Sequence, residues 1–115
     1  MRFVPKDPPR TFRVGINKEI ELSDCGNVYL EADEQVTFVT PSGKEHDFVA
    51  KPWGFYSTPS VNARLVDQGF KTALVSSPLS GRFFIMVVER ERLAEFEGYL
   101  RETQQEVVEW LDERR

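Results

Sequence analysis

The stretch KPWGFYSTPSVNARL (residues 51–65) is where the sequence changes from strand patterns to a helix pattern. Thr58 suits an N-cap, and Pro59 suits the first helical position because no amide hydrogen is needed there. Apolar residues four positions apart follow, which places them on one helix face. Gly69 suits the position just after a helix end. We therefore predict a helix of about ten residues that begins at Thr58 and ends before Gly69.

Strand patterns precede this helix. Apolar and polar residues alternate over residues 16–22, which is typical of a half-buried strand, and the same parity reaches back to Thr11. Gly15 inside this run predicts a bulge. The composition SDCGN (residues 23–27) predicts a turn. Beyond that turn we predict an antiparallel meander whose later strands cover residues 28–30, 36–40 and 45–50.

The second half of the chain predicts a hairpin, a helix and one further element. Residues 70–75 and 83–88 have strand patterns, and the second run is apolar on both faces, so we expect it to be a central strand. Residues 90–101 predict a helix with an apolar stripe. Residues 106–111 fit either a longer helix or an edge strand, and their two valines and a tryptophan favour the strand.

These elements predict an α+β fold, with a mostly antiparallel sheet (a meander plus a hairpin) and two helices packed on one face. The length of 115 residues suits one domain. Residues 1–10 contain three prolines, which predicts an extended N-terminal arm. We therefore expect residues 11–115 to form a single α+β domain.

Composition excludes several classes of partner. The net charge of −4 argues against a nucleic-acid partner, because phosphate contacts need clustered Lys and Arg. The longest apolar run, residues 83–88, is far shorter than the ~20 residues that span a bilayer, so no membrane partner is expected. Cys25 is the one cysteine, so no internal disulfide can form. We expect a reducing, cytoplasmic location.

Few residues in the sequence are suited to catalysis. With one histidine and one cysteine, a metal centre or a Cys–His pair is not expected, and no cofactor is predicted. His46 lies between two acidic residues near a predicted turn, so we expect it to be solvated. An enzyme would have to rely on Tyr, Arg and carboxylate groups, which makes a non-catalytic role the favoured prediction.

The opening stretch holds the best candidate binding residues. Aromatic rings stack on flat ligand faces, and Asn and Arg supply amide and guanidinium donors. The amides at a helix start beside Thr58 would attract an anionic group. If residues 53–56 form a strand, Trp53 and Phe55 share a face and Tyr56 points the other way. The predicted binding residues are Trp53, Tyr56, Thr58, Asn62 and Arg64; the alternative is that these aromatic residues only fill a corner of the core.

Residues 30–65, LEADEQVTFVTPSGKEHDFVAKPWGFYSTPSVNARL, together with Gly69-Phe70-Lys71 and FFIMVVE (residues 83–89), resemble an uncharacterised family of small bacterial proteins with no assigned activity. Some members of that family accompany genes for cell-surface sugars. The resemblance implies a carbohydrate or nucleotide-sugar ligand and transfers no site residues.

Three functions follow as alternatives. The first is a non-catalytic binding or accessory module for a sugar-like or anionic ligand. The second is a structural or interaction protein that acts as a homodimer or through a protein partner, because sheet edges are a common route to dimers. The third is a small enzyme that uses no metal.

Overall fold

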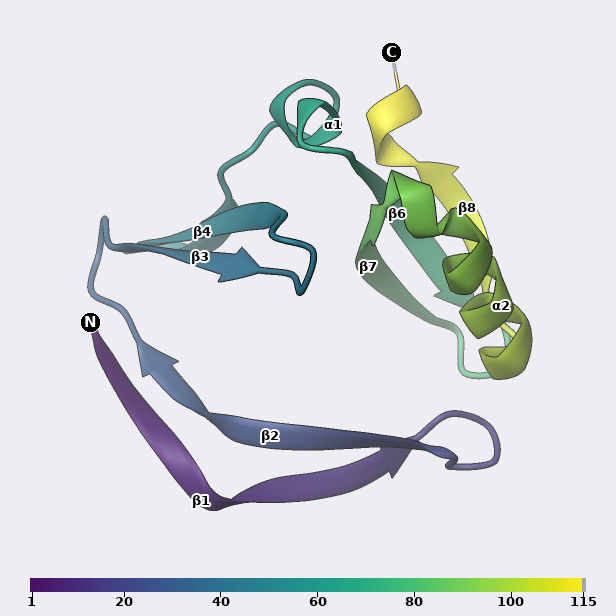
Figure 1. Ribbon diagram of the computed structural model, residues 1–115, viewed down its shortest axis with the longest axis horizontal. Coiled ribbons are helices and arrows are strands. Elements are labelled where there is room, and N and C mark those ends of the chain that lie inside the picture. The colour runs from purple at the N-terminus through teal and green to yellow at the C-terminus, as the bar shows by residue number, and fades with distance from the viewer. Residues whose placement is uncertain (115) are drawn as a thin grey trace. The chain divides into compact units, whose positions relative to one another are not determined.

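The computed structural model describes residues 1–114 and groups them into two compact units. Unit 1 consists of Met1–Phe38 and Asp47–Thr58, and unit 2 consists of Val39–His46 and the chain from Pro59 on. The elements in chain order are β1 (Arg2–Val14), β2 (Ile20–Tyr29), β3 (Gln35–Val39), β4 (Glu45–Lys51), β5 (Gly54–Ser57), α1 (Arg64–Asp67), β6 (Phe70–Ser77), β7 (Arg82–Glu89), α2 (Leu93–Thr103) and β8 (Glu106–Trp110), with short 3₁₀ turns at Arg90–Arg92 and Leu111–Glu113 (Figure 1).

The predicted class is confirmed in its main features, because antiparallel strands dominate and two α-helices are present. The strands form three sheets rather than one: β1–β2, β3–β4–β5 and β7–β6–β8. The packing of both helices on one face stays a prediction. So does the division into an N-terminal arm and one domain, although its boundary at residue 10 falls inside β1.

The β1–β2 ribbon corrects the prediction for the first strands. The chain reverses at residues 15–18, where the Lys18 amide donates to the Gly15 carbonyl at 3.1 Å. β2 continues through the predicted turn at residues 23–27, although its pairing with β1 is irregular there, between Pro5 and Arg10. Gly26 has another role there, because a Cβ at this position would lie 2.5 Å from the Val4 carbonyl oxygen. Its missing side chain therefore permits a close approach of two strands.

The first helix is much shorter than predicted. It covers Arg64–Asp67, and Ala63, with φ −137° and ψ −84°, breaks the helical path just before it. Ser60 satisfies the amides at this point: its hydroxyl accepts from the Arg64 amide at 2.8 Å and its carbonyl from the Leu65 amide at 3.0 Å. Thr58 is therefore not an N-cap, and the predicted start of the helix at Thr58 is wrong.

The core of unit 2 lies between α2 and the sheet β7–β6–β8 (Figure 1). Ala73 and Val75 of β6 and Leu100 of α2 are buried, and four partly buried side chains pack against them: Met86, Phe96, Val107 and Trp110. The predicted second helix and the favoured strand at the C-terminal end are confirmed as α2 and β8.

The position predicted for residues 83–88 is wrong. The order β7–β6–β8 places β6 in the centre and β7 at the edge. On one face of β7 Met86 packs against the core beneath α2 and Val88 is buried, whereas Phe84 on that face and the residues of the other face are exposed, so hydrophobicity on both faces did not mean burial on both faces.

Candidate functional site

The β4–β5 hairpin of unit 1 carries the aromatic residues of the opening stretch. Lys51 pairs with Gly54 at its end, so Pro52 and Trp53 form the connecting turn. Proline suits the second position of such a turn because its φ is already fixed. Trp53 follows it at the tip and is 70% exposed. The turn thus presents a large indole to solvent.

Trp53 and Tyr56 form a stacked pair. Their ring centroids are 5.9 Å apart and their planes differ by 21°. The register pairs Tyr56 with Val49 and Phe55 with Ala50, so Tyr56 and Phe55 project from opposite faces of the hairpin. The expectation that Trp53 would share a face with Phe55 is wrong, because Trp53 belongs to the turn and folds back onto Tyr56.

An ion pair lies on the same face as this stack. Lys51 is two residues from Val49, so its side chain projects on the Tyr56 face, where its ammonium group donates to the Asp33 carboxylate. The hydrogen bond with Asp33, with the attraction of its charge, raises the pKa of Lys51, and Tyr56 adds a smaller contribution. Asp33 is fixed by its backbone, whose amide donates to the Ala50 carbonyl at 2.7 Å.

An apolar hollow of about 320 Å³ lies elsewhere in unit 1. Phe55 and Phe48 line it from the hairpin face opposite to Tyr56, and Phe38 meets Phe48 edge-on with centroids 5.7 Å apart. The other lining residues are Val28, Leu30 and Val36. The hollow offers almost no polar groups and suits only apolar groups.

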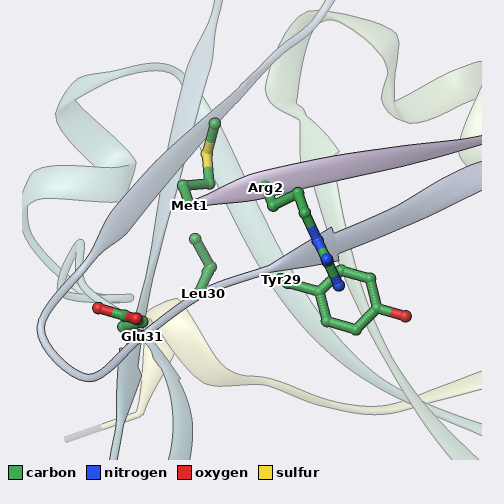
Figure 2. Close-up of a pocket in the computed structure, with 5 residues that line it drawn as sticks. All are labelled: Met1, Arg2, Tyr29, Leu30 and Glu31. Atoms are coloured by element: carbon green, nitrogen blue, oxygen red, sulfur yellow. The ribbon is translucent and has the colours of Figure 1, made fainter.

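A second hollow of about 360 Å³ lies where β1 begins and β2 ends (Figure 2). Figure 2 shows the Arg2 side chain across the ring of Tyr29, and the guanidinium carbon lies 4.6 Å from the ring centroid. Met1, Leu30 and Glu31 complete the lining. The Met1 ammonium group pairs with Glu34 at 2.9 Å, and the Arg2 cation already has an aromatic partner, so these charges are largely committed to internal contacts.

The structure brings together two of the five predicted binding residues, Trp53 and Tyr56. Thr58 lies in the same unit, but its hydroxyl donates to the Asp47 carbonyl at 3.3 Å and no helix begins there. Asn62 and Arg64 are exposed residues of unit 2. A shared hollow for all five residues stays a prediction.

Lys51 and Asp33 were not among the binding residues predicted from the sequence. Lys51 lies within the quoted stretch, two residues before Trp53, so its proximity was available as a signal. Asp33 comes 18 residues earlier than Lys51 in the chain, and only the pairing of its backbone with β4 brings it to the site.

Two other expectations concern His46 and metals. His46 was expected to be solvated but is buried in unit 2, with its ring 6.5 Å from that of Phe70.

Within residues 1–114, no three His, Cys, Asp or Glu side chains are grouped so that they could hold a metal ion. No helix in that part of the chain is both long and apolar enough to cross a membrane.

Comparisons with protein-family models, curated proteins and solved structures gave no match. The resemblance to a family of small bacterial proteins therefore stays a prediction.

Proposed function

We propose that this protein is a non-catalytic binding module that binds a sugar-like ligand on the Trp53–Tyr56 face of the β4–β5 hairpin. The observation that carries the proposal is the 70% exposed indole, held by a stacked neighbour at the tip of a short hairpin. A large aromatic side chain gains free energy when it is covered, and exposed Trp and Tyr are typical of recognition surfaces.

The two rings favour a flat ligand. The stack with Tyr56 restricts the indole before binding, which lowers the entropy lost when a ligand covers it. A saccharide ring presents a C–H face that fits such a surface, and its hydroxyl groups need polar partners at the edge. The ligand would therefore lie on the rings with its hydroxyls directed at the polar neighbours.

Those polar neighbours are Lys51 and Asp33. The carboxylate of Asp33 is largely exposed and accepts hydrogen bonds, and Lys51 donates them. Since the two charges already neutralise each other, the pair favours a neutral hydroxylated ligand over a strongly charged one. Of the two ligand classes expected from the sequence, we therefore favour the sugar-like class.

Calorimetric titration tests this proposal with three probes: glucose, N-acetylglucosamine and UDP-glucose. We expect glucose or N-acetylglucosamine to bind more tightly than the charged UDP-glucose, with a loss of roughly tenfold in affinity for Trp53→Ala (about 1.4 kcal/mol) and a several-fold loss for Asp33→Asn.

Phe55→Ala is the matched control, because Phe55 is exposed to a similar degree on the opposite face of the same hairpin. It should retain the wild-type affinity. Absence of binding for glucose and N-acetylglucosamine, or equal losses for Trp53→Ala and Phe55→Ala, would contradict the proposal.

A further inference from the structure

The outer edge of β7 offers unpaired backbone groups. Within unit 2 the strand order is β7–β6–β8, so β7 pairs with β6 on one side, and no strand of the described chain pairs with its other side. An open strand edge is a template for pairing with another strand.

This edge lacks the usual protection. Natural edge strands carry charges, prolines or bulges that block further pairing. Residues 83–88 of β7 contain none of these residue types, and the pairing of β7 with β6 runs without a shift from Phe70↔Glu89 to Ser77↔Arg82. The edge is therefore regularly paired and, between the charged residues Arg82 and Glu89 at its ends, apolar.

The face of β7 that does not carry Met86 is also open. Phe83, Ile85 and Val87 alternate along this face and are 63%, 61% and 38% exposed. Met86 packs against the core beneath α2, and Val88 on the same face as Met86 is buried. The row of Phe83, Ile85 and Val87 therefore lies next to the open edge, and Phe84 on the Met86 face is also partly exposed, at 41%.

We propose that a second copy of this chain pairs with β7 in an antiparallel arrangement, with the two-fold axis at Ile85, so that two three-stranded sheets join into one of six strands. A perpendicular two-fold axis requires one residue to lie opposite itself. With the axis at Ile85, Phe83 of each copy faces Val87 of the other, and the apolar row continues across the junction. An axis at Met86 would instead place Phe83 against Glu89.

A second copy suits this surface because its own row supplies an apolar partner at each position. In the antiparallel arrangement each Phe83 meets a Val87 and Ile85 meets its own copy, so one strand supplies both halves of the contact. Glu89 does not disturb the arrangement, since its carboxylate is held by Ser42, Thr40 and Arg92. The inference is independent of the proposed sugar site, which lies in unit 1.

Sedimentation at several concentrations tests the association. We expect a dimer for the full chain, and Ile85→Lys should raise the dimer dissociation constant by about a hundredfold or more, because two ammonium groups would meet at the axis. Val108→Lys is the matched control, since Val108 is 54% exposed on β8 at the other edge of the same sheet. This control should dimerise like the wild type.

Cross-linking tests the register in a Cys25→Ser background, which removes the exposed native thiol. Ile85→Cys should form a disulfide-linked dimer on mild oxidation, because directly opposed Cα atoms lie about 5 Å apart. Phe83→Cys should not, because its two copies would be separated by roughly 13 Å.

A monomer at every concentration overturns the proposal, as does a dimer that survives Ile85→Lys or is lost with Val108→Lys. Cross-linking through Phe83→Cys in preference to Ile85→Cys overturns the register. The sugar titration of Ile85→Lys should match that of the wild type, so failure of either proposal leaves the other to be judged separately.

Discussion

The two tryptophans differ most clearly in their environments. Trp53 is 70% exposed at a turn, whereas Trp110 is partly buried against Phe96, with ring centroids 5.8 Å apart. The Lys71 ammonium group also lies 4.7 Å from the Trp110 ring centroid. The same residue type therefore serves recognition in the first case, by our proposal, and packing in the second.

We expect truncation of these two tryptophans to change the free energy of unfolding by very different amounts. Trp53→Ala should change the free energy of unfolding by no more than about 0.5 kcal/mol, because little packing is lost at an exposed site. Trp110→Ala should lower it by about 3 kcal/mol, because a cavity would remain under α2. Denaturant titration measures both, and a large loss for Trp53→Ala would show that the indole is covered in solution.

Gly26 and Gly54 share a backbone requirement but differ in the space around them. Their φ angles are +150° and +140°, which L side chains rarely adopt. A Cβ at Gly26 would lie 2.5 Å from the Val4 carbonyl oxygen and 2.8 Å from the Pro5 Cα, whereas a Cβ at Gly54 would meet nothing within 4 Å.

We therefore predict that Gly26→Ala destabilises the β1–β2 ribbon by about 1–3 kcal/mol more than Gly54→Ala destabilises its own hairpin. The substitution at Gly54 is the control for backbone strain, so the difference between the variants reports the clash. Hydrogen exchange of the ribbon amides measures the effect. Similar losses for both variants would mean that β1 and β2 can separate slightly at no cost.

At the scale of elements, the 3₁₀ turn after β8 is attached to β6 by one carboxylate. Asp112 accepts from the Lys71 ammonium group at 2.8 Å and from the Thr72 amide at 3.0 Å. Burial of the carboxyl raises its pKa, but the hydrogen bonds from Lys71, Thr72 and the Asp112 backbone, with the charge of Lys71, outweigh burial, so the pKa of Asp112 is lowered from its usual value of 3.8.

This shift predicts a pH dependence. Since the folded pKa lies below the unfolded one, the stabilisation is fully present well above pH 3.8 and is lost as the pH falls through 3.8 toward the folded pKa. We expect Asp112→Asn to lower the free energy of unfolding by about 1–3 kcal/mol at pH 7, and this difference from the wild type should shrink in acid.

Glu113→Gln provides the comparison, because Glu113 is 63% exposed at 4.0 Å from Lys71 and should contribute little. Denaturant titrations at neutral and acid pH measure both variants. A difference for Asp112→Asn that stays constant with pH would contradict the role assigned to its charge.

At the scale of the molecule, the two units differ in how much apolar surface they bury. Within the described residues, Ala50 is the buried apolar residue of unit 1, whereas unit 2 buries Leu65, Phe70, Ala73, Val75, Val88 and Leu100. A two-stranded ribbon such as β1–β2 has little independent stability, because it lacks a third strand or a packed layer.

We therefore expect amides in β1 and β2 to exchange at least about tenfold faster than those of β6, the central strand of unit 2. Hydrogen exchange followed by mass spectrometry measures this contrast peptide by peptide. Equal protection in both units would contradict the prediction and would show that another surface covers the ribbon.

The strands were predicted most successfully where the local pattern and the tertiary contacts agree. The strands predicted at residues 36–40 and 45–50, the second helix and the C-terminal strand follow from periodicity and β propensity, which are local properties, whereas residues 28–30 proved to be the end of β2 rather than a separate strand. The first turn was misplaced because Gly26 fits a turn and a close strand contact equally well. The first helix was overextended because the capping signals at Thr58 and Pro59 ignore the competing hydrogen bonds of Ser60.

Part of the candidate site could also be predicted from the sequence. Trp53 and Tyr56 were identified from composition, because flat aromatic rings close in sequence to amide and guanidinium donors are suited to recognition. Asp33 was not, because its place beside Lys51 depends on a backbone hydrogen bond to Ala50, between residues far apart in the chain.

By itself the sequence determined the antiparallel α+β class and most strand and helix positions, since these depend on interactions between residues close together in the chain. Only the tertiary structure decided that the strands form three sheets, that β7 lies at an edge, and that Trp53 folds onto Tyr56. Those features depend on which distant backbone groups pair, and many pairings satisfy the same local pattern.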